Sequence, residues 1–295
     1  MPAGMNRRVI TMGNEKNIPE MFVHQCQRYN GRAAIKVKKN GVYTDISWDS
    51  LLHTVCSLSI GLAALGIRRD DKVAIIAESC PDWVYTDLAV LSLGAVTVPI
   101  FPTYRKRETE YIIQHSESRV IVISDNKQWG KISRVMDRNP GLYSVISFSP
   151  MPEEKGVRSL NEIITSHSHY SVPEKNQFLG RIRRINADDV ATIIYTSGTT
   201  GQPKGVMLTH QNFLSNCASS AKAIAVREGD TALSMLPLSH VFERMAGYYL
   251  FLYLGVTIAY AEGLHSLQKN FQEVRPHVAM IVPRIIEKFY HRIIG

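Results

Sequence analysis

Between residues 48 and 148, short β-branched segments alternate with segments of helical length. Strands are expected at residues 72–77, 95–101, 120–124 and 142–148, and helices at residues 48–65, 82–93, 106–116 and 127–137. Each connection between strands is long enough to hold a helix, so the strands are expected to run in the same direction. The predicted fold class is therefore α/β, with a parallel sheet.

The segments on either side of this region have their own signals. Residues 19–29 are typical of a short amphipathic helix, and residues 33–47 of a hairpin that turns on Asn40 and Gly41. Residues 167–186 contain Ser, His and Pro and end in RIRRIN, which predicts a linker. We expect a first subdomain over residues 1–185 and a second over residues 186–295. Within the second, strands are expected at 231–236, 256–261 and 278–282, and helices at 241–254 and 266–273.

Residues 190–206 read VATIIYTSGTTGQPKGV, a β-branched run that opens into a loop rich in glycine and hydroxyl groups. Gly198 and Gly201 allow the backbone to turn its amides toward an anion. Lys204 adds a point positive charge suited to a polyphosphate. Thr209 is expected to cap a helix, which would place the loop between a strand and a helix. The pattern predicts a phosphate-binding loop, with further donors from the hydroxyls of Ser197, Thr199 and Thr200.

Two alternatives compete with this interpretation. A Walker A loop would have Lys204 at the right step, but Pro203 replaces its second glycine and Gly205 replaces the Ser or Thr that holds Mg²⁺. A polar surface turn is the common fate of such compositions. A surface turn explains less well why a lysine and three hydroxyls directly follow a buried strand.

The segment YTSGTTGQPKGV resembles the signature loop of the AMP-forming adenylating enzymes, which include acyl-CoA synthetases, peptide-synthetase adenylation domains and firefly luciferase. LPLSHVFER at residues 236–244 and VPRIIEKFY at residues 282–290 resemble the long-chain fatty acid branch. The resemblance begins at about Ile18. It implies stacked parallel sheets flanked by helices, forming an incomplete N-terminal domain of an adenylate-forming enzyme.

The resemblance also implies a reaction. A long-chain fatty acid would be activated with ATP and Mg²⁺ to acyl-AMP and then transferred to CoA. Thr196, Ser197, Gly198, Thr199, Thr200, Gly201 and Lys204 are implied to bind the phosphates. Because two anions must meet, the work of the site is electrostatic positioning. The candidate catalytic residues are Lys204 and His240, and the sequence identifies no metal ligand.

His240 follows the strand expected at residues 231–236, where open α/β sheets gather ligands at the carboxyl ends of their strands. It could donate to the acyl carboxylate or to the α-phosphate. The alternative is a structural histidine bonded to backbone. Nearby aromatic residues such as Tyr248 are more often plain core than the wall of an acyl tunnel. The sequence does not decide whether Arg244 pairs with Glu243 or with another carboxylate.

Segments that the resemblance leads one to expect are not found. They are a Tyr-Gly-x-Thr-Glu segment whose Glu holds Mg²⁺, an Asp for the ribose, a hinge, and a C-terminal domain with a catalytic lysine. We therefore expect an isolated fragment or a shortened gene product that does not make acyl-CoA alone and that exposes an interior strand at residues 278–282. Two other functions stay open, namely a fatty acyl-AMP or aryl-acid ligase, and a non-catalytic ATP- or acyl-binding remnant.

Composition limits the partners. The formal charge is +8, with clusters at Arg68 and Arg69, at 105–107 and at 181–184. No zinc-finger spacing or aromatic RNA-binding motif accompanies them, so nucleic acid is not the expected partner. ATP, CoA and acidic lipid headgroups would account for the charge, and a cytoplasmic protein with peripheral attachment to a membrane is compatible with it. The uncharged run at residues 245–261 is split by Gly255 and is expected in the core. Four scattered cysteines predict reduced thiols.

Overall fold

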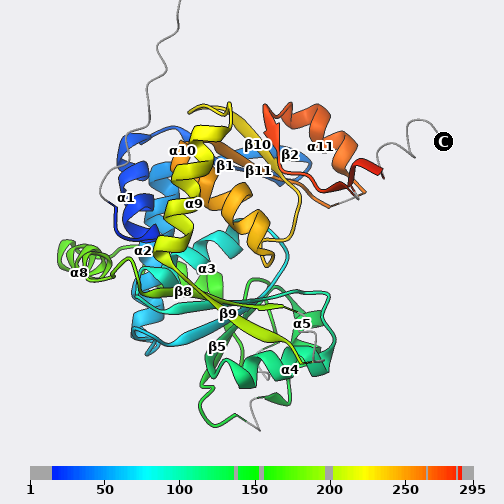
Figure 1. Ribbon diagram of the computed structural model, residues 1–295. Helices are drawn as coiled ribbons and strands as arrows, with labels where there is room; N and C mark the ends of the chain where they lie inside the picture. The colour runs from blue at the N-terminus through cyan, green and yellow to red at the C-terminus, as the bar shows by residue number, and fades with distance from the viewer. Residues whose placement is uncertain are drawn as a thin grey trace, which may run out of the picture.

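The computed structural model describes residues 15–135, 139–152, 156–196, 202–263, 265–283 and 285–287. It contains two sheets, and helices α2 (Trp48–Ala64) and α3 (Pro81–Leu91) lie between them. Figure 1 shows the smaller sheet at the top and the larger one below. The α/β class with stacked, mainly parallel sheets flanked by helices is thereby confirmed.

The larger sheet has seven strands in the order β7-β6-β5-β3-β4-β8-β9. All neighbours pair in parallel except β8 and β9, which are antiparallel. The strands are β3 (Lys72–Ile76), β4 (Val96–Ile100), β5 (Ser118–Ile123), β6 (Ser144–Ser147), β7 (Arg158–Ser159), β8 (Val190–Thr196) and β9 (Lys204–Thr209).

Both faces are buried at the central parallel strands β3, β4, β5 and β6, as parallel sheets require. Side chains alternate between the faces because successive residues of a strand point in opposite directions. Val73 and Ile75 of β3 belong to the core shared with α2 and α3, whereas Ala74 and Ile76 belong to a second core. Helices α4 (Lys106–His115) and α5 (Asn126–Ile132) cover that second face.

The smaller sheet has the order β12-β10-β11-β1-β2. Its strands are β1 (Ala33–Lys39), β2 (Val42–Ser47), β10 (Thr231–Ser234), β11 (Thr257–Tyr260) and β12 (Val278–Ala279). The hairpin prediction is confirmed: Asn40 has a φ of 50° and Gly41 a φ of 83°, as a two-residue turn of this kind requires. The remaining helical elements around this sheet are α1 (Ile18–Arg28), α9 (His210–Ala223), η2 (Glu243–Tyr249), α10 (Leu250–Leu254) and α11 (Leu267–Val274).

The predicted linker at residues 167–186 is wrong. Most of it is helix α8 (Val172–Arg183), which follows α7 (Leu160–Ser166). Ser171 Oγ accepts from the backbone N–H of Glu174, and the Glu174 carboxylate accepts from the N–H of Ser171 in return. This capping box, together with the burial of Phe178 and Ile182, stabilises a helix whose composition is otherwise polar.

The prediction that the loop lies between a strand and a helix is also wrong. Residues 204–209 form strand β9, so the loop connects two antiparallel strands. Thr209 does cap the following helix α9, with its Oγ1 accepting from the N–H of Asn212 at 3.2 Å. The turn chemistry of the loop suits either connection, and only the pairing of β9 with β8 distinguishes them.

Three further predictions bear on the second half of the chain. Residues 278–282 were expected as an interior strand, but β12 has two half-buried residues at the edge of the described sheet. Each sheet takes strands from both sides of residue 185, and the division into two subdomains stays a prediction. The run at residues 245–261 is buried, and among the described residues no helix is long and apolar enough to cross a membrane.

Candidate functional site

The base of the candidate phosphate loop is a two-stranded ladder. Thr196, the last residue of β8, pairs with Lys204, the first residue of β9. Both residues are exposed. The predicted binding residues Ser197, Gly198, Thr199, Thr200 and Gly201 lie outside the described residues. Their role therefore stays a prediction, while the ladder fixes where the loop leaves the sheet and returns to it.

Helix α4 supports this base from below. The Tyr111 hydroxyl donates to the carbonyl of Pro203 at 3.2 Å, and the Tyr195 hydroxyl lies 2.7 Å from Nδ1 of His115. The rings of Tyr111 and His115 stack with centroids 5.3 Å apart, and each meets Tyr195 edge to face. These contacts hold both ends of the loop against one helix, so Lys204 starts from a fixed backbone.

Gly205 is required by packing. A Cβ at this position would lie 2.8 Å from Cγ2 of Ile193 and 3.2 Å from Cζ of Tyr195. Real Cβ atoms essentially never approach other atoms this closely, so a Ser or Thr would displace the support of the loop. The glycine that breaks the Walker A pattern is thus also the residue that lets the Tyr195 ring lie over β9.

His240 has one ring nitrogen engaged and one free. Its Nδ1 accepts from the backbone N–H of Phe242 at 3.1 Å, so the neutral ring carries its proton on Nε2. The residue is exposed, and no group among the described residues bonds to Nε2. Its ring meets the ring of Phe101 edge to face, with centroids 6.2 Å apart. A hydrogen-bond donor is therefore presented at the surface.

The two candidate catalytic residues lie at the same edge of the larger sheet. Phe101 directly follows β4, and β4 is the parallel neighbour of β8, with Thr97 opposite Thr192. The contact between Phe101 and His240 thus brings the histidine to the edge where β8 opens into the loop. No direct contact joins His240 to Lys204 among the described residues.

Ser79 ties the His240 segment to the larger sheet. Its Oγ donates to the carbonyl of Leu236 at 2.9 Å and accepts from the N–H of Leu238 at 2.8 Å. Ser79 follows strand β3, whereas Leu236 follows strand β10 of the other sheet. One hydroxyl therefore fixes the segment that precedes His240 across the junction of the two sheets.

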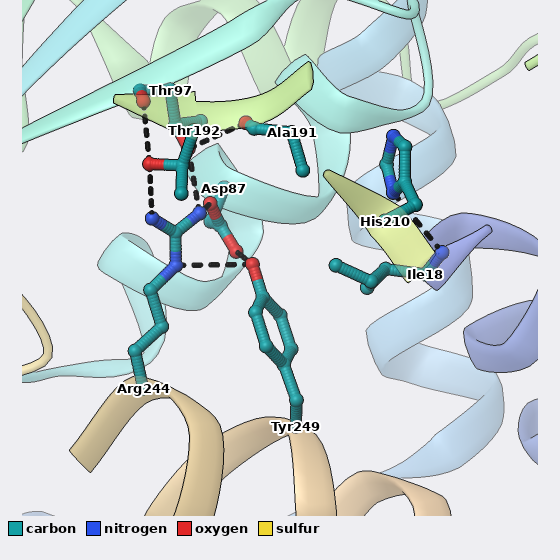
Figure 2. Close-up of polar contacts among 8 residues, drawn as sticks. All are labelled: Ile18, Asp87, Thr97, Ala191, Thr192, His210, Arg244 and Tyr249. Carbon is teal, nitrogen blue, oxygen red and sulfur yellow. Dashed lines mark hydrogen bonds and ion pairs between the residues drawn. The ribbon is translucent and has the colours of Figure 1, made fainter. Parts of the chain in front are cut away.

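Arg244 forms a buried polar cluster behind this segment (Figure 2). It makes an ion pair with Asp87 of α3, and its Nη1 and Nη2 donate to Oγ1 of Thr192 at 2.7 Å and of Thr97 at 2.6 Å. Its Nε donates to the Tyr249 hydroxyl at 3.0 Å, and that hydroxyl donates to Asp87 at 2.6 Å. Burial opposes the charge on Arg244, but Asp87 and Tyr249 raise its pKa above the usual value.

The two threonines of this cluster also join the strands. Thr192 Oγ1 donates to the carbonyl of Thr97 at 2.7 Å, and Thr97 Oγ1 donates to the carbonyl of Ala191 at 3.3 Å. Each hydroxyl therefore accepts from Arg244 and donates across β4 and β8. The cluster fixes the position of β8, and with it the origin of the candidate phosphate loop, relative to the His240 segment.

Glu243 is buried beside Arg244 but pairs elsewhere. Its Oε1 accepts from Ser234 Oγ at 2.6 Å, while its Oε2 has no partner among the described residues. Burial raises the pKa of Glu243 to about 7. Gly247, one π-helical turn further on, leaves room for this carboxyl, since a Cβ there would collide with it. π-helical turns are frequent at functional sites.

Sequence reasoning missed most of this support. It left Arg244 without a partner and did not identify Asp87, Thr97 or Thr192. One signal was present, because Asp87 is an acidic residue within the otherwise apolar helix sequence PDWVYTDLAVL. Within the described part of the chain, no group of three or more His, Cys, Asp or Glu residues could hold a metal ion.

The chain belongs to the family of AMP-binding enzymes, whose model matches residues 22–292. It is 30% identical over 294 residues to the long-chain fatty acid–CoA ligase heimdall of Drosophila melanogaster, covering 95% of this chain and 43% of that protein. It is 29% identical to the long-chain fatty acid–CoA ligase FadD15 of Mycobacterium bovis, covering 95% and 46%. The chain thus spans less than half the length of these relatives.

Solved structures agree on the fold. The long-chain fatty acid–CoA ligase FadD1 from Archaeoglobus fulgidus superposes with a TM-score of 0.80 at 22% identity, over 95% of this chain and 54% of that one. The N-terminal domain of FACL13 from Mycobacterium tuberculosis gives 0.77 at 24% identity, over 95% and 66%. The architecture is that of adenylate-forming enzymes, and the resemblance to part of the long-chain branch is confirmed.

Proposed function

We propose that this chain forms the ATP-binding part of a long-chain fatty acid–CoA ligase, which activates the acid as acyl-AMP before transfer to CoA. The names of relatives such as heimdall and FadD15 support the substrate class. The relative AEE15 of Arabidopsis thaliana is a ligase of long-chain fatty acids to acyl-carrier protein, so acyl-carrier protein is the alternative acceptor.

In this proposal the loop and Lys204 hold the β- and γ-phosphates of ATP. The carboxylate of the acid and the α-phosphate repel each other, and a nearby cation with several donors offsets that repulsion. Lys204 lies at the end of the β8–β9 pair of strands, and contacts of Tyr111 and Tyr195 hold this end in place. A fixed starting point reduces the entropy that the side chain loses when it binds phosphate.

The observation that carries the proposal is the donor on His240. Its Nδ1 is occupied by the Phe242 N–H, which leaves Nε2–H without a partner among the described residues, close to the edge where β8 opens into the loop. We assign Nε2–H to the oxygen that gains charge as the acyl–phosphate bond forms. A donor fixed in advance stabilises that charge without having to reorient.

The other components are proposed from the family. CoA and Mg²⁺ are used by the complete enzyme, and Mg²⁺ would neutralise phosphate charge. We further propose that the 295 residues bind nucleotide without making acyl-CoA alone. A cytoplasmic location with attachment to an anionic membrane surface rests on the charge of +8.

The test combines nucleotide binding with isotope exchange. ATP binding to the 295-residue chain is measured by calorimetry, and ATP–pyrophosphate exchange is measured in this chain and in the complete gene product with palmitate, acetate or benzoate. Exchange that depends on palmitate supports the proposal. Exchange with benzoate alone would favour an aryl-acid ligase, binding without exchange in either protein would favour the remnant, and absence of ATP binding would contradict the site.

A further inference from the structure

A groove lies away from the candidate active site, between the ends of helices α2 and α8. Its volume is about 730 Å³, within the range of sites that bind small molecules. Its walls come from the last turn of α2 with the segment that follows it, from α8 with the segment that follows it, and from Leu93. Figure 1 shows α8 at the left edge of the molecule.

Two arginine clusters that are far apart in the sequence meet at this groove. Arg68 and Arg69 line it from the α2 side, and Arg181 and Arg184 line it from the α8 side. Arg69 Nη1 donates to the carbonyl of Arg184 at 3.0 Å, which joins the two segments directly. Arg68 Nη1 donates to two carbonyls at the end of α2, at 2.8 and 3.1 Å. The guanidinium groups are therefore gathered by the fold.

Most of this positive charge is not neutralised. Arg69 pairs with Asp189 at 2.5 Å, but Arg68, Arg181 and Arg184 form no ion pair among the described residues. Burial lowers the pKa of Arg181, and the charges of Arg68 and Arg184 lower it further. Like charges brought close together repel one another, and a bound anion would offset that repulsion.

The one acidic side chain among the lining residues is already engaged. Glu174 accepts from the N–H of Ser171 at 2.7 Å and from its hydroxyl at 2.7 Å, as part of the cap of α8. Its charge is thus directed to the start of that helix. It does not pair with any of the four arginines.

The floor of the groove is aliphatic. Ile60 and Ala63 are half-buried on α2 and Ala64 is exposed, while Leu93 and Ile185 lie buried beneath them. Exposed aliphatic surface beside guanidinium groups suits a ligand with an anionic head and a hydrocarbon chain. Burial of each methylene contributes about 0.8 kcal/mol when it is complete.

We propose that this groove binds a single-chain lipid bearing a phosphate group, with the phosphate among the arginines and the first methylenes on the aliphatic floor. The planar guanidinium offers two parallel N–H donors to a phosphate, so several arginines can share one head group. The proposal is independent of the fatty acid–CoA ligase function. Neither Lys204 nor His240 lines the groove, and none of the residues that line it belongs to the candidate active site.

The experiment titrates the 295-residue chain with decyl phosphate below its micelle concentration, in a calorimeter. Inorganic phosphate lacks the chain, and decyl glucoside lacks the charge. Both should bind at least about ten-fold more weakly than decyl phosphate. Octyl phosphate should bind more weakly by about two- to four-fold per methylene removed, depending on how completely the chain is buried.

Two double variants locate the binding. Arg181→Gln with Arg184→Gln should weaken decyl phosphate binding at least about ten-fold, because two charge-assisted contacts are lost. Lys175→Gln with Arg183→Gln removes the same charge from α8 outside the groove and should change affinity by less than about two-fold. Thermal unfolding of each variant shows whether it is folded.

Three outcomes would overturn the proposal. They are equal weakening by the two double variants, loss of decyl phosphate binding on saturation with ATP, and binding only to phosphatidate-containing vesicles but not to monomeric decyl phosphate. The Lys204→Ala variant tests the other candidate phosphate site. Decyl phosphate that bound at the candidate phosphate loop would bind this variant more weakly. Retained affinity in that variant supports the groove.

Discussion

Arg244 and Asp87 form an ion pair in which both side chains are completely buried. They lie 157 residues apart in the sequence, on η2 and α3. Every nitrogen of the guanidinium group that can donate has an acceptor in this cluster. The pair therefore acts as a joint between the His240 segment and the strand that begins the phosphate loop.

Asp87→Asn should destabilise the protein by roughly 3–5 kcal/mol, because it leaves the Arg244 charge buried and unpaired. Chemical denaturation with circular dichroism measures the free energy of unfolding. The exposed pair of Lys36 and Asp45 provides the control, and Asp45→Asn should cost at most about 1 kcal/mol. Equal effects of the two substitutions would show that the buried pair is not a structural joint.

Lys204→Ala should weaken the binding of ATP far more than that of AMP. The lysine is assigned to the β- and γ-phosphates, which AMP lacks, and a charge-assisted contact contributes on the order of 1.5–3 kcal/mol. Calorimetric titrations of both nucleotides into the wild-type chain and the variant measure the difference. A similar loss for the two nucleotides would place Lys204 elsewhere.

His240→Ala should lower acyl-adenylate formation in the complete gene product by roughly 10²–10³-fold, as expected when a transition-state donor is lost. Its free Nε2–H is the group removed. Initial rates of ATP–pyrophosphate exchange give the change. His240→Gln, which can restore an N–H donor, should recover part of the rate, and unchanged exchange in a folded alanine variant would leave His240 a structural role.

Glu243 should make stability depend on pH. Its carboxyl titrates near 4.5 in the unfolded chain but at a pKa of about 7 in the native protein. The native state therefore binds more protons between these values, and the free energy of unfolding falls as the pH rises from 4.5 to 7. The total contribution is about 3 kcal/mol.

Glu243→Gln should remove this slope, which is measured by urea denaturation at a series of pH values. The comparison must be between variant and wild type, because His210 acts in the opposite direction. Burial lowers the pKa of His210 from 6.5 to about 4. Stability is therefore lost as the pH falls from 6.5 to 4, because the unfolded chain binds a proton in this range and the native state does not. Parallel pH profiles for wild type and variant would contradict the raised pKa of Glu243.

Gly255→Ala should be strongly destabilising, by more than about 2 kcal/mol, since strain and a clash add together. Gly255 ends α10 with a φ of 69°, and a Cβ there would collide with the ring of Tyr29. Gly31 has a φ of 77° with open space around it, so Gly31→Ala should cost about 1 kcal/mol from strain alone. Thermal unfolding of the two variants gives the comparison.

Local signals predicted local structure well. The Asn40-Gly41 turn and the alternation of strands with helices required only neighbouring residues, and both are observed. The failures arose where a local pattern allowed two outcomes. Polar composition concealed α8, although its capping pair of Ser171 and Glu174 was readable in the sequence.

The site shows the same limit. Lys204 and His240 could be proposed from the sequence because they belong to continuous motifs, whereas Asp87 and Thr97 come to Arg244 from separate elements. A single sequence does not specify which of many carboxylates meets a buried arginine. The orientation of His240 likewise depends on the Phe242 N–H, a backbone group that carries no signal in the sequence.

The hairpin near the start of the chain has a consequence for biosynthesis. Strand β1 pairs with β11, and the Tyr43 hydroxyl of β2 donates to the carbonyl of Tyr260, 217 residues later. At translation rates of about 5–20 residues per second, the ribosome releases this partner roughly 10–45 seconds after the hairpin emerges. Throughout that interval the inner edge of β1 is unpaired, and the nascent chain must be kept from other strands. We therefore expect the smaller sheet to need protection by chaperones until β11 has been synthesised.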